Sequence, residues 1–147
     1  ILGKERFDYA FKNYISKWAY KHPAPWDFFR AIENGAGEDL GWFWKGMFIE
    51  NYKLDQSITS VTYVKNDPKQ GALVTVDNLG EMVMPLYIQY TTESGKSGLM
   101  KIPVEVWQNG GKWIQKLPTT EKLSTVTIDP DHVFPDINVD NNTWKSN

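Results

Sequence analysis

The sequence contains no cysteine and only two histidines among its 147 residues. Disulfide frameworks and thiolate metal sites are therefore excluded, although the cellular compartment cannot be read from this. No apolar run approaches the roughly 20 residues that span a bilayer, so we expect no membrane segment. The formal net charge is −2, without a basic cluster. Nucleic-acid binding and a polybasic membrane anchor are therefore not expected.

The sequence also lacks the short motifs that carry catalysis. His22 and His132 lie far apart, and no His-Glu-x-x-His pair places two imidazoles on one helix face. A Gly-x-Ser-x-Gly elbow and a phosphate-cradling glycine loop are missing as well. His22 stands before Pro23 and is interpreted as a helix C-terminal residue. We therefore predict no catalytic, cofactor-binding or metal-binding residue in this chain.

The composition supplies ample material for a packed core. The chain is 41% hydrophobic and 14% aromatic, with 7 Trp, 7 Tyr and 7 Phe, which suits one ordinary domain or a small domain plus a fragment of another. It begins at Ile1 without an initiator methionine or a signal segment. We expect that an upstream part is missing together with any targeting signal, which leaves localisation undetermined; a periplasmic or secreted parent is compatible.

Residues 1–56 show helical periodicity. The first apolar stripe consists of Phe7, Ala10, Phe11, Tyr14, Ile15, Trp18 and Ala19. Pro23 ends this helix, and Pro25 begins a second one, which Gly35 and Gly37 are expected to end. A third helix is predicted from the spacing of Leu40, Phe43, Trp44, Met47 and Phe48. Because helices this aromatic bury their stripes poorly against one another, we expect their surface to meet the β-rich part, a missing upstream domain or a second copy in a homodimer.

Residues 57–130 change to a period of two, which is typical of strands. The alternating apolar residues are Val61, Tyr63, Ala72, Val74, Val76, Met82, Met84, Leu86, Ile88, Tyr90, Met100, Ile102, Val104, Val106, Val126 and Ile128. Turn residues separate these runs, so we predict an antiparallel β-sandwich of six to seven strands, with Pro85 and Pro103 on edges or bulges. The predicted fold class is α+β, a three-helix segment followed by this sandwich.

Residues 131–147 are predicted to form an extended tail. The acidic residues Asp129, Asp131, Asp136 and Asp140 suggest calcium ligands, but solvated turns are the commoner role of such tails. Asn141-Asn142-Thr143 fits a glycosylation acceptor, a tripeptide that is common by chance.

Exposed aromatics would support a different class of function. Trp107, Trp113 and Tyr87 suggest a glycan- or peptide-binding face, although core packing explains aromatic residues more often. Glu81 and Glu93 with Glu105 are interpreted as exterior residues and give no evidence for a glycosidase pair.

Several ordered strings resemble one known family. They read Glu5-Arg6-Phe7-Asp8-Tyr9-Ala10-Phe11-Lys12, then Tyr14-Ile15-x-x-Trp18-Ala19-Tyr20-Lys21-His22-Pro23, Asp27-Phe28-Phe29-Arg30, Asp39-Leu40-x-Trp42-Phe43-Trp44-Lys45-Gly46, and, near the end, Ile128-Asp129-Pro130-Asp131, Phe134-Pro135-Asp136-Ile137-Asn138 and Asn141-Asn142-Thr143-Trp144. Together they are similar to the stretch that follows the active site in bacterial members of the aminopeptidase N family of zinc metallopeptidases (gluzincins).

The resemblance implies a C-terminal, non-catalytic portion of such a peptidase. The family's zinc, held by two His and a Glu, its general-base Glu and its Tyr would all lie upstream of Ile1, as would binding of the peptide substrate. The chain departs from the pattern at Ala24, where a helix-capping Thr is common, and at Met47, where Trp is common. We therefore expect a supporting role beside an upstream zinc-bearing catalytic domain, and the alternative is a self-standing β-sandwich module for glycan or peptide.

Overall fold

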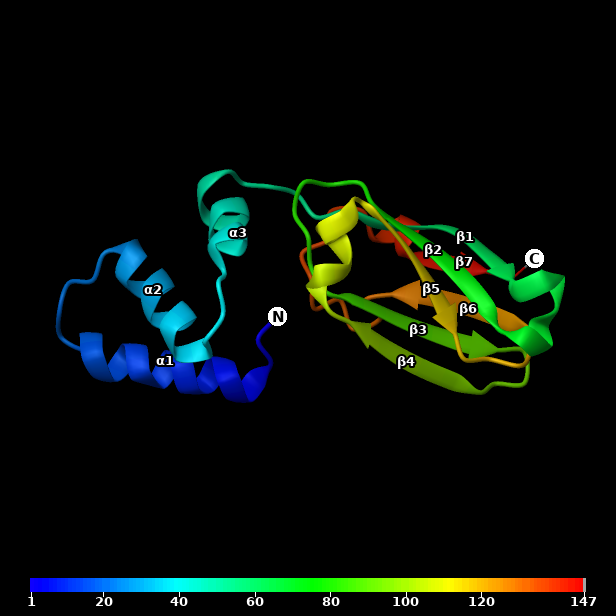
Figure 1. The fold of residues 1–147 in the computed structure, drawn as a ribbon, viewed down its shortest axis with the longest axis horizontal. Helices are drawn as coiled ribbons and strands as arrows, with labels where there is room; N and C mark the ends of the chain where they lie inside the picture. Colours follow the sequence, from blue (N-terminus) through cyan, green and yellow to red (C-terminus); the bar gives the residue numbers. More distant parts are fainter. Residues whose placement is uncertain (147) are drawn as a thin grey trace. The chain divides into compact units, whose positions relative to one another are not determined.

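The computed structural model describes residues 1–146. They fall into two compact units, the helical unit Ile1–Asn51 and the sheet unit that begins at Tyr52. Figure 1 shows helices along the first unit and two antiparallel sheets in the second. The predicted α+β class is thereby confirmed. No helix within the described residues is long and apolar enough to cross a membrane.

The helical unit contains α1 (Lys4–Trp18), α2 (Pro25–Ala36) and α3 (Gly41–Trp44), which continues as the π-helical turn η1 (Lys45–Ile49). The third helix predicted from the spacing of Leu40 to Phe48 is present, but it is not α-helical throughout. It has only four α-helical residues before the backbone widens. Two glycines in so short a segment weaken regular helix formation, and π-turns arise where the normal bonding pattern is disturbed.

Gly35 lies inside α2, so the prediction that it ends this helix is wrong. A Cβ atom added there would lie 2.6 Å from the Cα atom of Ala10, which is fully buried in α1. The two small residues let the helix backbones approach closely. Gly37 ends the helix instead, in the left-handed conformation with φ 66°, which glycine adopts without strain.

The sheet unit has seven strands among the described residues, within the predicted range of six to seven. One sheet has the order β1-β2-β5, formed by β1 (Gln56–Tyr63), β2 (Ala72–Asn78) and β5 (Lys112–Leu117). The other has the order β4-β3-β6-β7, formed by β4 (Ser97–Ile102), β3 (Leu86–Thr92), β6 (Leu123–Ile128) and β7 (Thr143–Lys145). Neighbouring strands are antiparallel throughout.

The core of this unit takes residues from both sheets. Burial alternates most clearly along β2 and at the start of β3, as a period of two requires. The buried cluster consists of Ala72, Val74, Val76, Leu86, Ile88, Ile102, Trp107, Leu117, Leu123, Val126 and Ile128.

Two predicted runs extend beyond their strands. Strand β4 ends at Ile102 and does not include Val104 and Val106 of the predicted run. Pro103 has no N–H to donate to a neighbouring strand, and it caps the 3₁₀ helix η4 (Val104–Asn109). The run with Met82 and Met84 is buried but is not a strand, since β3 begins only after the buried Pro85. Both prolines therefore flank strands and are not part of a pairing ladder.

The tail is more structured than a plain extended segment. It contains the 3₁₀ helix η5 (Val139–Asn142) and then β7, which pairs with β6. Asp136 forms a parallel bridge with Leu54, and the Ile137 amide donates to the Leu54 carbonyl at 3.0 Å. These contacts fasten the tail to the segment that precedes β1.

Candidate functional site

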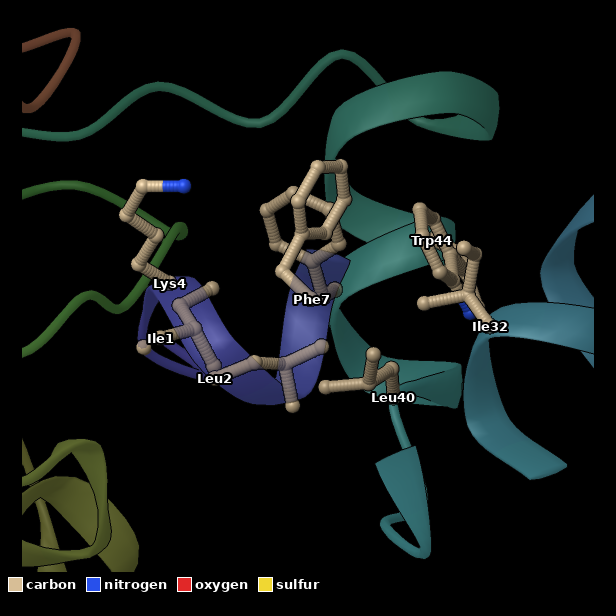
Figure 2. A pocket seen from close by; sticks show the side chains of 9 residues that line it. Ile1, Leu2, Lys4, Phe7, Ile32, Leu40 and Trp44 are labelled. Carbon is tan, nitrogen blue, oxygen red and sulfur yellow. The ribbon is translucent and has the colours of Figure 1, made fainter. Parts of the chain in front are cut away.

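A hollow of about 430 Å³ lies on the helical unit. Its lining comes from the chain start, α1, α2 and α3: Ile1, Leu2, Gly3, Lys4, Phe7, Ile32, Leu40, Phe43 and Trp44. Figure 2 shows Leu2 and Phe7 on one side of it and Leu40 and Trp44 on the other. Lys4 is the only charged residue in this lining, so the hollow suits an apolar occupant.

Stacked aromatic rings form the wall beside the hollow. The Phe29 and Trp44 rings are stacked, with centroids 4.6 Å apart, and the Phe28 ring meets Trp44 edge-on at 5.8 Å. Ile32 and Leu40 are almost completely buried next to these rings. Such aromatic contacts add to the free energy gained from buried area, so this wall stabilises the helical unit.

Hydrogen bonds fix the helices around the hollow. The Oε1 atom of Glu33 accepts from the Leu40 amide at 3.2 Å and from the Trp44 indole N–H at 3.1 Å. The Arg6 guanidinium donates to the Ala36 carbonyl at 2.8 Å and to the Glu38 carboxylate at 2.6 Å. Both sets of bonds tie the end of α2 to its neighbours.

An exposed ridge adjoins the hollow along α1. Phe7, Phe11 and Ile15 follow one another at helical spacing and remain 43%, 39% and 47% exposed. The Phe7 and Phe11 rings are nearly parallel, with centroids 5.6 Å apart. Because Phe7 also lines the hollow, ridge and hollow form one continuous surface.

The surface continues on the far side of the hollow into η1. Phe43 lines the hollow, its ring centroid lies 6.4 Å from that of Phe48, and Phe48 is 61% exposed. We define the apolar face as the ridge, the hollow and Phe48 together. Its exposed and pocket-lining apolar residues are contiguous, and such surfaces mark interaction sites.

An ion pair borders the apolar face. The Lys4 ammonium pairs with the Asp8 carboxylate one turn further along α1. The hydrogen bond from Lys4 lowers the pKa of Asp8. Both side chains are exposed to solvent, so they define the charge at the rim of the face and contribute little to stability.

Sequence reasoning predicted the apolar stripe of α1 but missed the hollow. Leu2 precedes the helix N-cap Gly3, and Phe7 is the fourth residue of α1. An apolar pair at these two positions is the signature of a hydrophobic staple. That signature was present in the sequence and indicates a chain start folded back toward the helix.

His22 and His132 are both exposed and belong to different units. Within residues 1–146, no three His, Cys, Asp or Glu side chains are grouped as metal ligands.

The acidic residues of the tail have structural partners. The Asp129 carboxylate is buried and accepts from the amides of Val133 and Phe134 at 3.1 and 2.8 Å. The Asp136 carboxylate accepts from the Gln56 amide at 3.0 Å. Asp131, like Asp140, is exposed. The four residues suggested as calcium ligands thus act separately, two of them as caps for backbone N–H groups.

The sequon also has a structural role. The Asn141 side-chain nitrogen, to which a glycan would be attached, donates to Asp55 at 2.8 Å in a partly buried contact.

The aromatics suggested for glycan binding are used in packing. Trp107 is buried, and its indole donates to the Met84 carbonyl at 2.8 Å. Trp113 is partly buried against the core, and Tyr87 meets the Phe134 ring edge-on at 5.1 Å. These residues do not form an exposed row of rings. The three glutamates interpreted as exterior residues, Glu81, Glu93 and Glu105, are exposed as predicted.

No protein-family model matches the chain, and no curated protein is significantly similar to it. The apolar face and its surroundings therefore carry the functional argument.

Proposed function

We propose that this chain is the C-terminal, non-catalytic part of a zinc-dependent aminopeptidase-type metallopeptidase. In this proposal the helical unit completes the wall of an upstream catalytic domain, which supplies the zinc, its ligands and the peptide-binding site. In the same proposal the sheet unit is a β-sandwich domain of that protein. The ordered strings that resemble the aminopeptidase N family motivate the proposal, and the apolar face is the structural observation that supports it.

The helical unit buries too little of its apolar surface for a self-sufficient domain. Its fully buried core consists of Ala10, Phe29, Ile32, Leu40 and Trp44. The ridge on α1 has the periodicity of a core-facing stripe, yet it is exposed. A stripe of this kind is normally covered by another element. An upstream helical domain of the same protein would provide that cover.

The way the sheet unit buries its residues supports the proposed β-sandwich. Inward residues of both sheets belong to one cluster, for example Val74 and Val76 of β2 with Ile88 of β3. Two antiparallel sheets that share one core have the sandwich architecture.

Activity measurements on a short and a long protein test the proposal. We expect the purified 147-residue chain to bind no stoichiometric zinc and to release nothing from aminoacyl-arylamide substrates. A longer protein from the same source, extended upstream of Ile1, should carry a His-Glu-x-x-His motif and release the arylamine in a chelator-sensitive reaction.

A substitution in the apolar face then tests the supporting role. Phe11→Glu in the longer protein should lower its melting temperature and its activity, whereas Ile114→Glu on the sheet unit, where Ile114 is 56% exposed, should change neither. Chelator-sensitive turnover by the short chain would refute the proposal. An upstream sequence without zinc ligands would also refute it. So would a longer protein whose melting temperature and activity are unchanged by Phe11→Glu.

A further inference from the structure

A polar cleft of about 240 Å³ lies between α1 and α2. Two tyrosines, two asparagines and one lysine line it: Tyr9, Tyr14, Asn13, Asn34 and Lys17. We propose that this cleft binds a sugar acid, which is a single sugar ring that carries one carboxylate. The proposal concerns the helical unit alone and does not depend on the peptidase proposal.

The cleft exists because the two helices meet through small residues. At Gly35 the backbone of α2 lies so close to Ala10 of α1 that no side chain fits between them. Larger side chains can stand only beside this contact, where they border a hollow. Gly35 itself lines the cleft, and the Tyr14 ring is held at its side by an edge-on contact with Phe28 at 5.0 Å.

The cleft lies on the opposite side of α1 from the exposed ridge. Tyr9, Asn13 and Lys17 each follow a residue of the ridge by two positions. Two positions correspond to about 200° around the axis of an α-helix, so the two rows of side chains point in nearly opposite directions. An upstream domain that packs on the apolar face therefore need not close the cleft.

The polar groups of the cleft are available to a ligand. The side chains of Asn13, Asn34 and Tyr9 make no hydrogen bond with any described residue, and Lys17 forms no ion pair within residues 1–146. Each carboxamide can both donate and accept, which suits the hydroxyl groups of a sugar. The Tyr9 side chain is 61% exposed, and the negatively polarised face of its ring suits the C–H groups of a sugar ring.

The charge around the cleft favours an acid over a neutral sugar. Lys17 is the only charged residue in the lining. The sequence between Asp8 and Asp27 contains three lysines and no acidic residue. On α2 the Glu33 carboxylate is bonded on the side of the apolar hollow. A single ammonium in a region of positive charge attracts one negative charge, and a carboxylate accepts strong, charge-assisted hydrogen bonds from it. A doubly charged phosphate would find only one cation in this lining.

NMR titration of the isotope-labelled 147-residue chain with glucuronate tests the proposal. The side-chain amide signals of Asn13 and Asn34 should shift and saturate. A dissociation constant of about 1 mM is expected for a ligand of about a dozen non-hydrogen atoms. Glucose, which lacks the carboxylate, and acetate, which lacks the sugar ring, should each bind at least about fivefold more weakly.

Substitutions in the lining locate the site. Lys17→Gln should weaken glucuronate binding at least about fivefold and leave glucose binding unchanged. Asn34→Asp should weaken glucuronate binding further, because it places a carboxylate beside the anion. Lys12→Gln, on the same helix but outside the lining, and Asn109→Asp, at an exposed position of the sheet unit, are the matched controls and should bind like the wild type. Far-UV circular dichroism shows whether each variant keeps its helices.

Four results would each overturn the proposal. The first is the absence of saturable shifts at tens of millimolar glucuronate, and the second is glucose or acetate that binds as tightly as glucuronate. The third is a folded Lys17→Gln or Asn34→Asp variant that binds glucuronate like the wild type. The fourth is a control variant that is as disruptive as these two.

Discussion

The helical unit and the sheet unit use their apolar residues in opposite ways. Among the described residues, ten of the sixteen large apolar side chains that remain exposed belong to the helical unit, although that unit is about a third of the chain. The sheet unit instead buries alternate residues of both sheets in one cluster. An antiparallel sheet pairs distant strands and encloses its own core, whereas an isolated helical hairpin covers only one side of each helix. The first unit therefore leaves much of its apolar surface exposed, whereas the second encloses most of its own.

The largest effect should come from truncating a core residue of the sheet unit. Ile88 is fully buried between both sheets' residues, and Ile88→Ala should lower the free energy of unfolding by about 3 kcal/mol, as buried truncations commonly do. Phe11→Ala on the half-exposed ridge should cost about 1 kcal/mol or less in the monomer. Urea unfolding followed by tryptophan fluorescence at low protein concentration measures both. If Ile88→Ala and Phe11→Ala lowered the free energy of unfolding equally, the two units would not differ in the way described.

The tightest contact of the helical unit gives the next effect. Gly35→Ala places a methyl group 2.6 Å from the Ala10 backbone, so α1 and α2 must separate. We expect a loss of about 2 kcal/mol, against the usual gain for Gly→Ala in a helix. Gly41→Ala is the control, because its new Cβ would approach only a side-chain atom, the Oδ1 of Asp39, at 3.1 Å and no backbone atom. A stabilised Gly35→Ala variant would mean that the two helices are not held this closely.

A substitution in the tail tests how much the last residues contribute to the stability of the sheet unit. Asp136→Ala removes the acceptor of the Gln56 and Asn138 amides, and we expect a loss of about 2 kcal/mol, mainly from the partly buried Gln56 N–H left unpaired. Asp131→Ala, at an exposed position, should be neutral. Thermal melts with and without added calcium complete the test. A large calcium-dependent rise of the melting temperature that Asp136→Ala abolishes would contradict the capping role.

The smallest effect is a gain in the helical unit. The Asp27 carboxylate accepts from the Ala24 amide at 2.9 Å, but Ala24 has no side-chain acceptor to bond the helix in return. Ala24→Ser should complete the capping box and raise stability by about 1 kcal/mol. Ala24→Val provides the control without a hydroxyl group. If both variants melt alike, the start of α2 is not limited by its cap.

Local patterns predicted much of this fold. The stripe of α1, the start of α2 at Pro25 and the alternation around Ile88 were all evident in the sequence. Short-range chemistry determines each of them, through helix periodicity, a fixed proline φ angle and strand pleating. The fold class followed from the same signals.

Other elements depend on partners far along the chain. β5 was not recognised as an apolar run, because Gln115 interrupts the inward-facing series of Trp113 and Leu117. β7 is only three residues long. The Asp136 carboxylate accepts a hydrogen bond from the amide of Gln56, which lies 80 residues away in the sequence. The hollow required the chain start, α2 and α3 together. The link to a zinc aminopeptidase stays a prediction.

The attachment of the tail also has a consequence for biosynthesis. Asp136 and Ile137 bond to residues at the beginning of the sheet unit, and β7 completes the sheet from the chain's final stretch. A ribosome translates these residues long after β1 has emerged. In the nascent chain the edge of β6 therefore stays unpaired until residue 145 has left the ribosome. Chaperones or proteases have access to this edge until then.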